Sequence, residues 1–555
     1  MSNKQKHFSR RSFLAGTALA GAGVAAGMVG CSTTEESATD TTTASDITWD
    51  KECDVIVIGS GTGLSAAVAA ASKGSEVIVL EKLGYTGGSV RYSGGGVWIC
   101  NSTYSQEFGD TEEKSRAYLK LMQRDQGDDE ISEAFLENGQ MVLDLLSETC
   151  NIEWRAGQYT DYHPEWDGAM EQGRGLGAAA REDEETSGSL SGGVRLVSRL
   201  EEGLENYGVE VLTDTPATRL LTQADKNGAN EVIGVVAIQD DVEINIKARK
   251  GVILASGGFE WDEELKKNYI GGPAQYQRSV PSNTGDSLKM VIRLGADLRM
   301  MNACWGNVVY KEESAKLNAE GTPVGVSLLM DRAKPSTIIV DRTGRRFCNE
   351  ACDYDTLWWA FQNRETWGDT NYLADGAYLI ADSKFVSKFG LSSLGDTSKD
   401  IPEEAIVADS IEELAEKLDM PVDQLANTIA RFNGYVEQGL DPDFHRGESI
   451  FDKTFMVDTD YLGTTQATLG TLDSPPYYAL EVATANTGTH GGPRVNKNAQ
   501  VIHIDGEPIP RLYAAGNVAG VGAPGMAYGG PGGTIGPALV FNVLAGLHAS
   551  DLESL

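Results

Sequence analysis

CDVIVIGSGTGLSAAVAAASKGSEVIVLEK, residues 53–82, is the stretch that decides the fold. It begins with an apolar run, Val55–Ile58, which predicts a buried parallel strand. A glycine turn and an alanine-rich helix follow, and a second apolar strand then ends at Glu81. Strand, glycine turn, helix and strand in this order predict an α/β fold with a Rossmann-like domain that binds a dinucleotide.

The glycines of this turn have the spacing G-x-G-x-G, one residue tighter than the usual G-x-G-x-x-G. Residues without side chains let the turn amides approach a pyrophosphate at the N-terminus of the helix. A carboxylate at the end of the second strand can accept a hydrogen bond from a ribose hydroxyl. The residues expected to bind the nucleotide part of the cofactor are Gly59, Gly61, Gly63, Glu81 and Lys82.

A second glycine-rich segment, GGSVRYSGGGVW (residues 87–98), favours FAD over NAD. Continuous glycine leaves a smooth backbone surface for a flat ring system, and the serines of the segment supply hydroxyl groups. Strands that end in glycine recur at residues 251–260 and 511–520. The positive end of the last helix, near Thr534, is expected to face the flavin C2 carbonyl. The further residues expected to bind FAD are Gly88, Ser89, Ser93, Gly94, Gly95, Gly257, Gly516, Asn517, Thr534 and Ile535.

The composition is that of an ordinary globular protein. Of its 555 residues, 41% are hydrophobic and 23% are charged, and the length allows two or three domains. Its 64 glycines occur in clusters, which indicates backbone that lies against a ligand. The net charge of −35 leaves no basic patch to neutralise phosphates, so nucleic acid is excluded as a partner.

The stretch between the cofactor motifs has a different character. It contains amphipathic helical patterns, such as residues 410–439, and an aromatic segment, LWWAF, at residues 357–361. We interpret residues 313–485 as an α+β cap domain inserted into the FAD-binding domain, whose two parts are residues 49–312 and 486–555. Substrate sites commonly lie at such a junction. The LWWAF segment either lines an apolar substrate pocket or packs into the core of the cap.

The first 48 residues have the features of an export signal and a tether. SRRSFL (residues 9–14) carries a twin arginine, and the apolar run that follows is too short and too rich in glycine to span a membrane. MVGC, ending at Cys31, resembles a lipoprotein processing site. Residues 1–31 therefore predict export of the folded protein by the twin-arginine route to the cell envelope. A lipid on Cys31 would anchor it to the membrane surface, on the outer face of the cytoplasmic membrane, and residues 32–48 predict a disordered tether.

The other six cysteines indicate no metal centre. None belongs to a C-x-x-C pair or to a C-x-x-C-H haem-attachment motif. Cys348 and Cys352 alone do not make a metal site, and an iron–sulfur cluster stays open as an alternative. Because the chain shows no second redox centre, we expect its electrons to be exchanged with a membrane-associated electron carrier.

Together these motifs resemble the FAD-dependent family that includes soluble fumarate reductases and 3-ketosteroid Δ1-dehydrogenases. The resemblance extends from about Cys53 to the C-terminus, with gaps in the cap. It rests on GSGTGLSAA, SGGGVWI, RRFCNEA and LYAAGNVAG…YGGPGGTIGPA. It implies FAD as the cofactor and oxidation or reduction of a CH–CH bond. Both branches share the flavin motifs, so only the active-site positions distinguish them.

In the fumarate reductase branch, one arginine delivers the proton and another clamps a carboxylate. The first would fall at Tyr354, four residues after Glu350, and the second within Met526–Thr534, which contains no arginine. A dicarboxylate would therefore find no guanidinium group at these positions. His490, in GTHGG, is the one feature shared with this branch, and we interpret it as a polar neighbour of the cofactor.

The 3-ketosteroid dehydrogenase branch fits better. It places a tyrosine base in the segment after N-E, which matches Tyr354. A tyrosine and a glycine amide that hold the C3 carbonyl match Tyr528 and Gly532. A further tyrosine beside the base matches Tyr162, with Tyr159 as a wall residue. The resemblance thus implies these residues as the catalytic set and a neutral ketone or enone, steroid-like, as the substrate.

This interpretation carries expectations about mechanism. Free tyrosine has a pKa of about 10, so Tyr354 needs help from Tyr162, which either stabilises the phenolate by a hydrogen bond or passes the proton to solvent. The same residues can serve ketone dehydrogenation or enone reduction, and we expect reduction of an external enone. The alternatives are a fumarate-reductase-like enzyme that reduces an unsaturated carboxylate and a non-catalytic flavin lipoprotein that transfers electrons.

Overall fold

Five parallel strands form the centre of the largest sheet, in the order β19-β9-β1-β2-β6. β18 pairs antiparallel with β19 at one edge, and β7 and β8 extend β9 as an antiparallel meander. Both faces of β1 and β2 are buried, which is why their sequences are continuous apolar runs. The bounds are β1 Lys51–Ile58, β2 Val77–Leu80, β6 Glu210–Leu212, β7 Ala217–Ala224, β8 Asn230–Gln239, β9 Val242–Leu254, β18 Gln500–Ile502 and β19 Pro508–Ala514.

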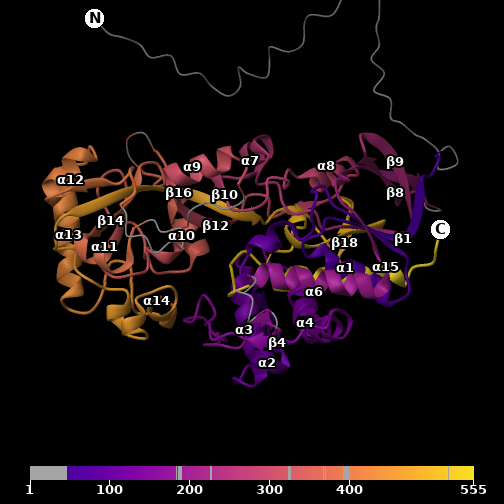
Figure 1. Cartoon of the computed structure of the whole chain (residues 1–555), viewed down its shortest axis with the longest axis horizontal. Helices are drawn as coiled ribbons and strands as arrows, with labels where there is room; N and C mark the ends of the chain where they lie inside the picture. The colour runs from indigo at the N-terminus through magenta and orange to yellow at the C-terminus, as the bar shows by residue number, and fades with distance from the viewer. Residues whose placement is uncertain are drawn as a thin grey trace, which may run out of the picture. The chain divides into compact units, whose positions relative to one another are not determined.

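Small residues let the two helices that border the cofactor motifs pack closely. α1 (Gly63–Ser72) is rich in alanine, and α15 (Ile535–Ser550) has Gly546 at their contact. A Cβ atom at Gly546 would lie only 2.4 Å from the carbonyl oxygen of Ala66. Figure 1 shows α1 and α15 beside one another below β1. This packing brings turns from opposite ends of the chain to the same side of the sheet.

The remaining elements of this part cover the sheet and its edges. A three-stranded sheet of β3, β4 and β5 and the pair β11 and β17 are separate from the main sheet. In Figure 1, α6 and α4 lie below α1 and α15. The bounds are α2 Thr103–Gln106, α3 Glu112–Gln123, α4 Asp129–Cys150, α6 Gly192–Tyr207, α7 Glu263–Tyr269, α8 Asp286–Arg293, β3 Val97–Trp98, β4 Trp154–Ala156, β5 Gly175–Ala178, β11 Leu298–Arg299 and β17 Gly492–Pro493.

A second sheet is built around the long strand β16. Its first half pairs antiparallel with β14 and β15, and its second half lies between β12, which is antiparallel, and β10, which is parallel. β13 completes the sheet beyond β14. The bounds are β10 Tyr276–Gln277, β12 Cys304–Tyr310, β13 Thr337–Val340, β14 Ala377–Asp382, β15 Ile406–Ala408 and β16 Tyr477–Thr489. The sheet thus includes strands on both sides of the predicted cap boundaries at residues 313 and 485.

The cap sheet separates two hydrophobic cores. In β13, Ile339 faces one core, whereas Ile338 and Val340 face the other. This alternation follows from the two-residue period of a strand and explains an apolar run in a sheet that is covered on both faces. The helices of the cap are α9 Lys311–Ala319, α10 Tyr354–Phe361, α11 Ser383–Phe389, α12 Ile411–Lys417, α13 Val422–Val436 and α14 Ile450–Thr454.

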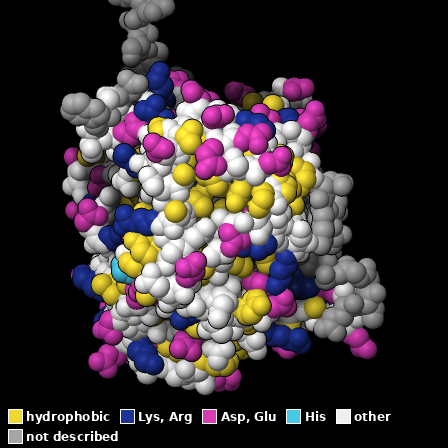
Figure 2. Space-filling model, turned by 90° about the vertical axis from the view of Figure 1, so that its left-hand side faces the viewer, with side chains coloured by type: hydrophobic (Ala, Val, Ile, Leu, Met, Phe, Trp, Pro, Cys, Tyr) yellow, Lys and Arg dark blue, Asp and Glu magenta, His cyan; other side chains and the backbone are white. Residues whose placement is uncertain are grey.

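The computed structural model describes residues 47–555 except residues 183, 185–190, 226–227, 323–326, 367, 369, 392–400 and 523. These residues belong to one compact unit, Ile47–Leu555. The twin-arginine segment and Cys31 lie outside the described residues. Of the helices that are described, none combines the length and the apolar character needed to cross a bilayer. Figure 2, which views the cap end, shows acidic and basic side chains interspersed with small groups of hydrophobic ones.

Candidate active site

A cavity of about 880 Å³ lies where the carboxyl ends of the parallel strands meet the cap sheet. Residues that end or directly follow β1, β2, β9 and β19 line it, as expected for a ligand site in an α/β fold. Its wall includes nearly all of the predicted site residues. They are Gly59, Gly61, Glu81, Lys82, Gly88, Ser89, Ser93, Gly94, Gly95, Gly257, Gly516, Asn517, Thr534 and Ile535, together with Tyr162, Tyr354, Tyr528 and Gly532.

The glycines of the wall leave room for a ligand that touches backbone. A Cβ atom added at Gly61 or Gly88 would meet no atom closer than 3.7 Å, and one at Gly94 would meet none within 4 Å. Gly59 is a glycine for a different reason, because its φ is +102° and a Cβ would lie 2.4 Å from the Ala255 carbonyl oxygen. Open glycines on a tight turn at a helix N-terminus fit the pyrophosphate of a dinucleotide.

Gly63, which we predicted to bind the cofactor, is absent from the cavity wall, so the structure does not support this prediction. It is the first residue of α1, and a Cβ there would lie 2.8 Å from Cβ of Ala255 and 3.2 Å from Cγ1 of Val57. Gly63 therefore lets α1 approach β1 closely. This is the packing role of the third glycine in the usual motif, which the tighter spacing still provides.

Hydrogen bonds fix the position of the Glu81 carboxylate at the end of β2. Its Oε2 accepts hydrogen bonds from the amide of Ser60, at 3.0 Å, and from the Ser60 hydroxyl, and its Oε1 accepts from the amide of Leu83 at 2.8 Å. The carboxylate is thus anchored beside the glycine turn, where a ribose is expected. Lys82 points its Nζ at Asp286 in α8, at 2.9 Å, so it closes the nucleotide end of the cavity by an ion pair.

The N-terminus of α15 lies at the cavity wall. Thr534 and Ile535, at the start of this 16-residue helix, both line the wall. Gly532, two residues before Thr534, has a φ of +90°, and a Cβ there would lie 2.2 Å from the carbonyl carbon of Gly96. Two backbone segments therefore touch at a position that only glycine allows, beside a helix end that favours negative charge.

Three tyrosines from distant parts of the chain meet at this end. The ring centroids of Tyr162, Tyr354 and Tyr528 lie 5.2 to 5.5 Å apart, pair by pair. The hydroxyls of Tyr162 and Tyr354 are 3.5 Å apart, and the Tyr528 hydroxyl is 3.4 Å from Oγ1 of Thr534. The structure thus brings together the whole tyrosine set implied by the resemblance. Tyr159 also lines the cavity and is exposed.

Burial raises the pKa of each of these tyrosines. The pKa of Tyr354 lies well above 10 because the ring is desolvated and Tyr162 and Tyr528 are close by. Desolvation likewise raises the pKa of Tyr162 and of Tyr528. The Tyr162 hydroxyl lies within reach of the Tyr354 oxygen, but burial and the neighbouring tyrosines favour the phenol of Tyr354 over its phenolate. Tyr354 is a phenol at neutral pH, ready to donate a proton.

The LWWAF segment of α10, residues 357–361, does not line the cavity. Asp353 caps α10, its Oδ1 accepting from the amides of Asp355 and Thr356. Leu357, Trp358 and Phe361 are buried, and Trp358 packs so tightly on Gly306 of β12 that a Cβ there would lie 2.2 Å from the indole. Of the two open alternatives, packing into the interior is the one realised. It holds Tyr354, the first residue of α10, at the cavity wall.

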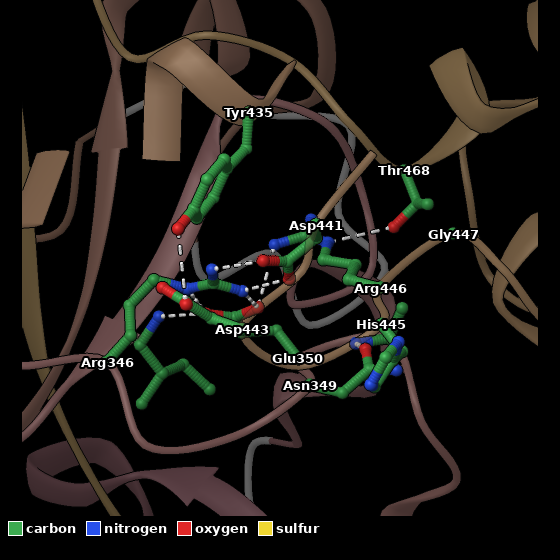
Figure 3. Close-up of polar contacts among 12 residues, drawn as sticks. Arg346, Asn349, Glu350, Tyr435, Asp441, Asp443, His445, Arg446, Gly447 and Thr468 are labelled. Carbon is green, nitrogen blue, oxygen red and sulfur yellow. Dashed lines mark hydrogen bonds and ion pairs between the residues drawn. The ribbon is translucent and has the colours of Figure 1, made fainter. Parts of the chain in front are cut away.

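A buried charge cluster holds the loop before α10 (Figure 3). Glu350 accepts hydrogen bonds from Arg346, at 2.7 and 2.9 Å, and from Arg446 at 3.1 Å. Arg346 also binds both oxygens of Asp441, at 2.9 and 3.1 Å. All four side chains are at most 4% exposed. Both carboxylates and both guanidinium groups are paired, so the protein interior can accommodate their charges. The pairs connect the segment that leads to Tyr354 with the rest of the cap.

The two positions at which the fumarate reductase branch has arginines contain none in this chain, but arginines line the cavity at other positions. Among the described residues, three arginines line the cavity: Arg155, Arg195 and Arg278. Arg195 pairs with Glu184 at 2.9 Å, and Arg155 is largely exposed. Arg278 directly follows β10 and is partly buried. It belongs to no motif of the resemblance, so the sequence carried no signal that would place it here.

Other unpredicted residues come from the cap sheet. Trp305 and Asn307 in β12 and Thr487 in β16 line the cavity. Trp305 contacts Tyr528, with ring centroids 5.3 Å apart, and donates from Nε1 to the Asn517 side chain at 3.1 Å. Asn307 is a polar residue inside an otherwise apolar strand, a signal that could have identified it.

His490 is not a neighbour of the cofactor cavity, contrary to our interpretation. It does not line the wall, and Trp305 stacks on it with ring centroids 3.5 Å apart. Burial lowers the pKa of His490 to about 3, so the imidazole is neutral. It packs behind Trp305. The described residues include no group of three or more potential metal ligands, and the described cysteines are unpaired thiols.

Comparisons with known proteins agree with this site. The model of a family described as FAD binding domain matches residues 54–534, and the chain belongs to this family. It is 32% identical to a 3-oxosteroid 1-dehydrogenase of Mycobacterium tuberculosis, over 90% of this chain and 99% of that protein. It is 30% identical to a 4-oxocyclohexanecarboxylate 2-dehydrogenase of Sinomonas cyclohexanicum, over 89% of this chain and 92% of that protein.

A solved structure extends the likeness to three dimensions. The 3-ketosteroid Δ1-dehydrogenase of Sterolibacterium denitrificans, in complex with 1,4-androstadiene-3,17-dione, has a TM-score of 0.79 at 25% identity and covers 90% of this chain and 99% of that chain. The Rossmann-like domain with an inserted cap is thereby confirmed. The protein is an FAD-dependent oxidoreductase that acts on CH–CH bonds, of the family that contains the 3-ketosteroid dehydrogenases and fumarate reductases.

Proposed function

We propose that the protein adds or removes hydrogen across the CH–CH bond next to a ketone of a cyclic, steroid-like substrate. The observation that carries the proposal is the meeting of Tyr162, Tyr354 and Tyr528 with Gly532 at one end of the cavity. These are the residue types that an enolate needs: donors to its oxygen and a proton carrier at its α carbon.

The glycine turn, Glu81 and the N-terminus of α15 would hold FAD, which when bound would supply or accept the hydride at the β carbon of the substrate. Tyr528 and the amide of Gly532 donate hydrogen bonds to the ketone oxygen and so stabilise the enolate, with about 3 kcal/mol per donor. Tyr354 carries the proton at the α carbon. Tyr162, whose hydroxyl lies 3.5 Å from that of Tyr354, exchanges the proton with it.

The protonated state of Tyr354 supports enone reduction as the working direction. A phenol whose pKa is raised by burial holds its proton at neutral pH, and reduction needs that proton at the α carbon. Dehydrogenation would first have to remove it. The substrate class includes steroids and smaller cyclic ketones, the two kinds of compound after which the similar dehydrogenases are named.

The purified, FAD-loaded protein is therefore expected to reduce a 3-keto-1,4-diene steroid under anaerobic conditions with reduced viologen as the electron donor. The matched reaction uses the 1,2-saturated steroid and an artificial oxidant. Faster turnover in this second reaction at neutral pH would show that dehydrogenation, and not enone reduction, is the working direction. Reduction of fumarate but of no enone would favour the carboxylate alternative, and turnover of none of these compounds would leave only electron transfer.

We further propose that residues 1–31 direct export and that lipid on Cys31 anchors the protein at the envelope, near a membrane-associated electron carrier. The support is the sequence alone, a twin arginine at Arg10 and Arg11 and the MVGC segment. The wild-type protein is expected in the membrane fraction and the Cys31→Ser variant in the soluble fraction of the envelope. Equal amounts of both in the membrane fraction would contradict the anchor. Membranes that fail to transfer electrons to the wild-type protein would contradict the carrier.

A further inference from the structure

Arg278 enters the cavity from the cap sheet. It follows β10, and its amide donates to the carbonyl of Asn486 in β16 at 2.8 Å. Thr487, the next residue of β16, lines the same cavity. So does Asn307 of β12, which pairs with Ala485 of β16. The guanidinium-bearing residue is therefore part of the wall that β10, β16 and β12 form together.

The same wall contacts one of the three tyrosines. Trp305 of β12 packs against Tyr528, the residue that we assign to the ketone oxygen. β10 and β12 flank β16 on opposite sides. Because neighbouring strands lie about 4.8 Å apart, the backbone at Arg278 is on the order of 10 Å from that of β12. Arg278 is therefore about two strand spacings away from the strand that contacts Tyr528.

The charge around the cavity is unequal at its two ends. The acidic residues that line it, within the described part of the chain, are Glu81 and Asp286. Glu81 is bound by Ser60 and Leu83 and Asp286 by Lys82, so both lie at the nucleotide end. The wall that contains the tyrosines also contains Arg278, a partly buried residue whose pKa is lowered by burial. In a chain of net charge −35, this end of the cavity favours an anion.

We propose that Arg278 binds a carboxylate of the substrate, so that the substrate is a cyclic oxo acid with its ketone at Tyr528 and its carboxylate at the far side of the cavity. The inference rests on the proposed function and narrows its substrate class. A guanidinium group binds a carboxylate through two parallel hydrogen bonds. Arg278 would thus orient the ring as well as hold it, because the ketone and the carboxylate are bound at two separate points.

The test compares 4-oxocyclohexanecarboxylate with its neutral carboxamide on wild-type, Arg278→Gln and Arg278→Lys proteins loaded with FAD. Dissociation constants come from the change in flavin absorption on binding, and kcat/KM comes from turnover with an artificial oxidant. Arg278→Gln is expected to weaken binding of the carboxylate about 100-fold, the size of effect seen when one partner of a buried charge pair is removed. Binding of the carboxamide is expected to change less than about 3-fold. Arg278→Lys, which keeps the charge and loses the paired geometry, is expected to fall between them.

A surface arginine provides the control for loss of one positive charge. Arg431→Gln, at a side chain that is 60% exposed on α13, is expected to bind both compounds as the wild type does. Equal weakening of carboxylate and carboxamide by Arg278→Gln would overturn the inference, as would loss of bound FAD, which would assign Arg278 to the cofactor. An unchanged carboxylate affinity would overturn it too. If the wild-type protein turned over a neutral ketone without preferring the acid, this inference alone would fail, whereas no turnover of any ketone or enone in either direction would refute the proposed function.

Discussion

Tyr354→Phe is expected to lower kcat about 1,000-fold with every enone or ketone that the protein accepts. The substitution removes the hydroxyl that carries the proton at the α carbon and leaves the ring, which contacts Tyr162 and Tyr528 at centroid distances of 5.5 and 5.2 Å. The site should therefore keep its shape. Steady-state turnover with reduced viologen and a 3-keto-1,4-diene steroid gives the measurement, and flavin absorption reports that FAD is still bound.

Two further variants separate the role of Tyr354 from a general effect of losing a hydroxyl. Tyr528→Phe removes one donor to the ketone oxygen and is expected to lower kcat about 100-fold, because such a donor stabilises the transition state by about 3 kcal/mol. Tyr207→Phe changes an exposed tyrosine at the end of α6 and is expected to have no effect. If Tyr354→Phe and Tyr207→Phe turned over substrate equally fast, Tyr354 would not be the proton carrier.

Glu350→Gln is expected to lower the free energy of unfolding by about 3–5 kcal/mol. The substitution neutralises the carboxylate that Arg346 and Arg446 share, and so leaves positive charge without compensation in the interior of the cap. Urea unfolding of the FAD-loaded protein, followed by tryptophan fluorescence, gives the measurement. Glu413→Gln, at an exposed residue of α12 paired with Lys417, is the matched control and is expected to stay within about 0.5 kcal/mol of the wild type.

The stability of Glu350→Gln is also expected to depend on pH differently from that of the wild type. The two arginines lower the pKa of Glu350 to about 2, against an ordinary value of 4.5. A carboxyl group whose pKa is lowered by folding contributes stability above its unfolded pKa and loses it as the pH falls toward the folded pKa. The wild type should therefore lose this contribution between pH 4.5 and 2, and Glu350→Gln should lose less over that interval. Parallel profiles for the two proteins would contradict the role of the charge cluster.

The cofactor half of the site could be predicted because its signals are local. β1, the glycine turn and α1 are consecutive, so a strand pattern, the glycines and the alanines between residues 53 and 72 predict the turn directly. Gly63 is the instructive exception. Whether a glycine in such a turn faces a ligand or a neighbouring element depends on where Ala255 lies, and Ala255 follows β9, which is distant in the sequence.

The substrate half was predicted only through its resemblance to a family. Tyr162, Tyr354 and Tyr528 are far apart in sequence, and no periodicity indicates that their rings meet. Their pKa values depend on burial, which the sequence does not state, and burial favours the phenol of Tyr354 over the phenolate that we expected Tyr162 to stabilise. His490 shows the same limit, because Trp305 of β12 separates it from the cavity.

The sequence by itself determined that the chain binds FAD on a Rossmann-like domain, since that fold is encoded by elements that follow one another. Only the tertiary structure decided what faces the substrate. Arg278 reaches the cavity because β10, β16 and β12, which are separated by up to two hundred residues in the chain, pair side by side in one sheet. Hydrogen bonds between such distant strands are set by the packing of the whole cap and leave no mark in the local sequence pattern.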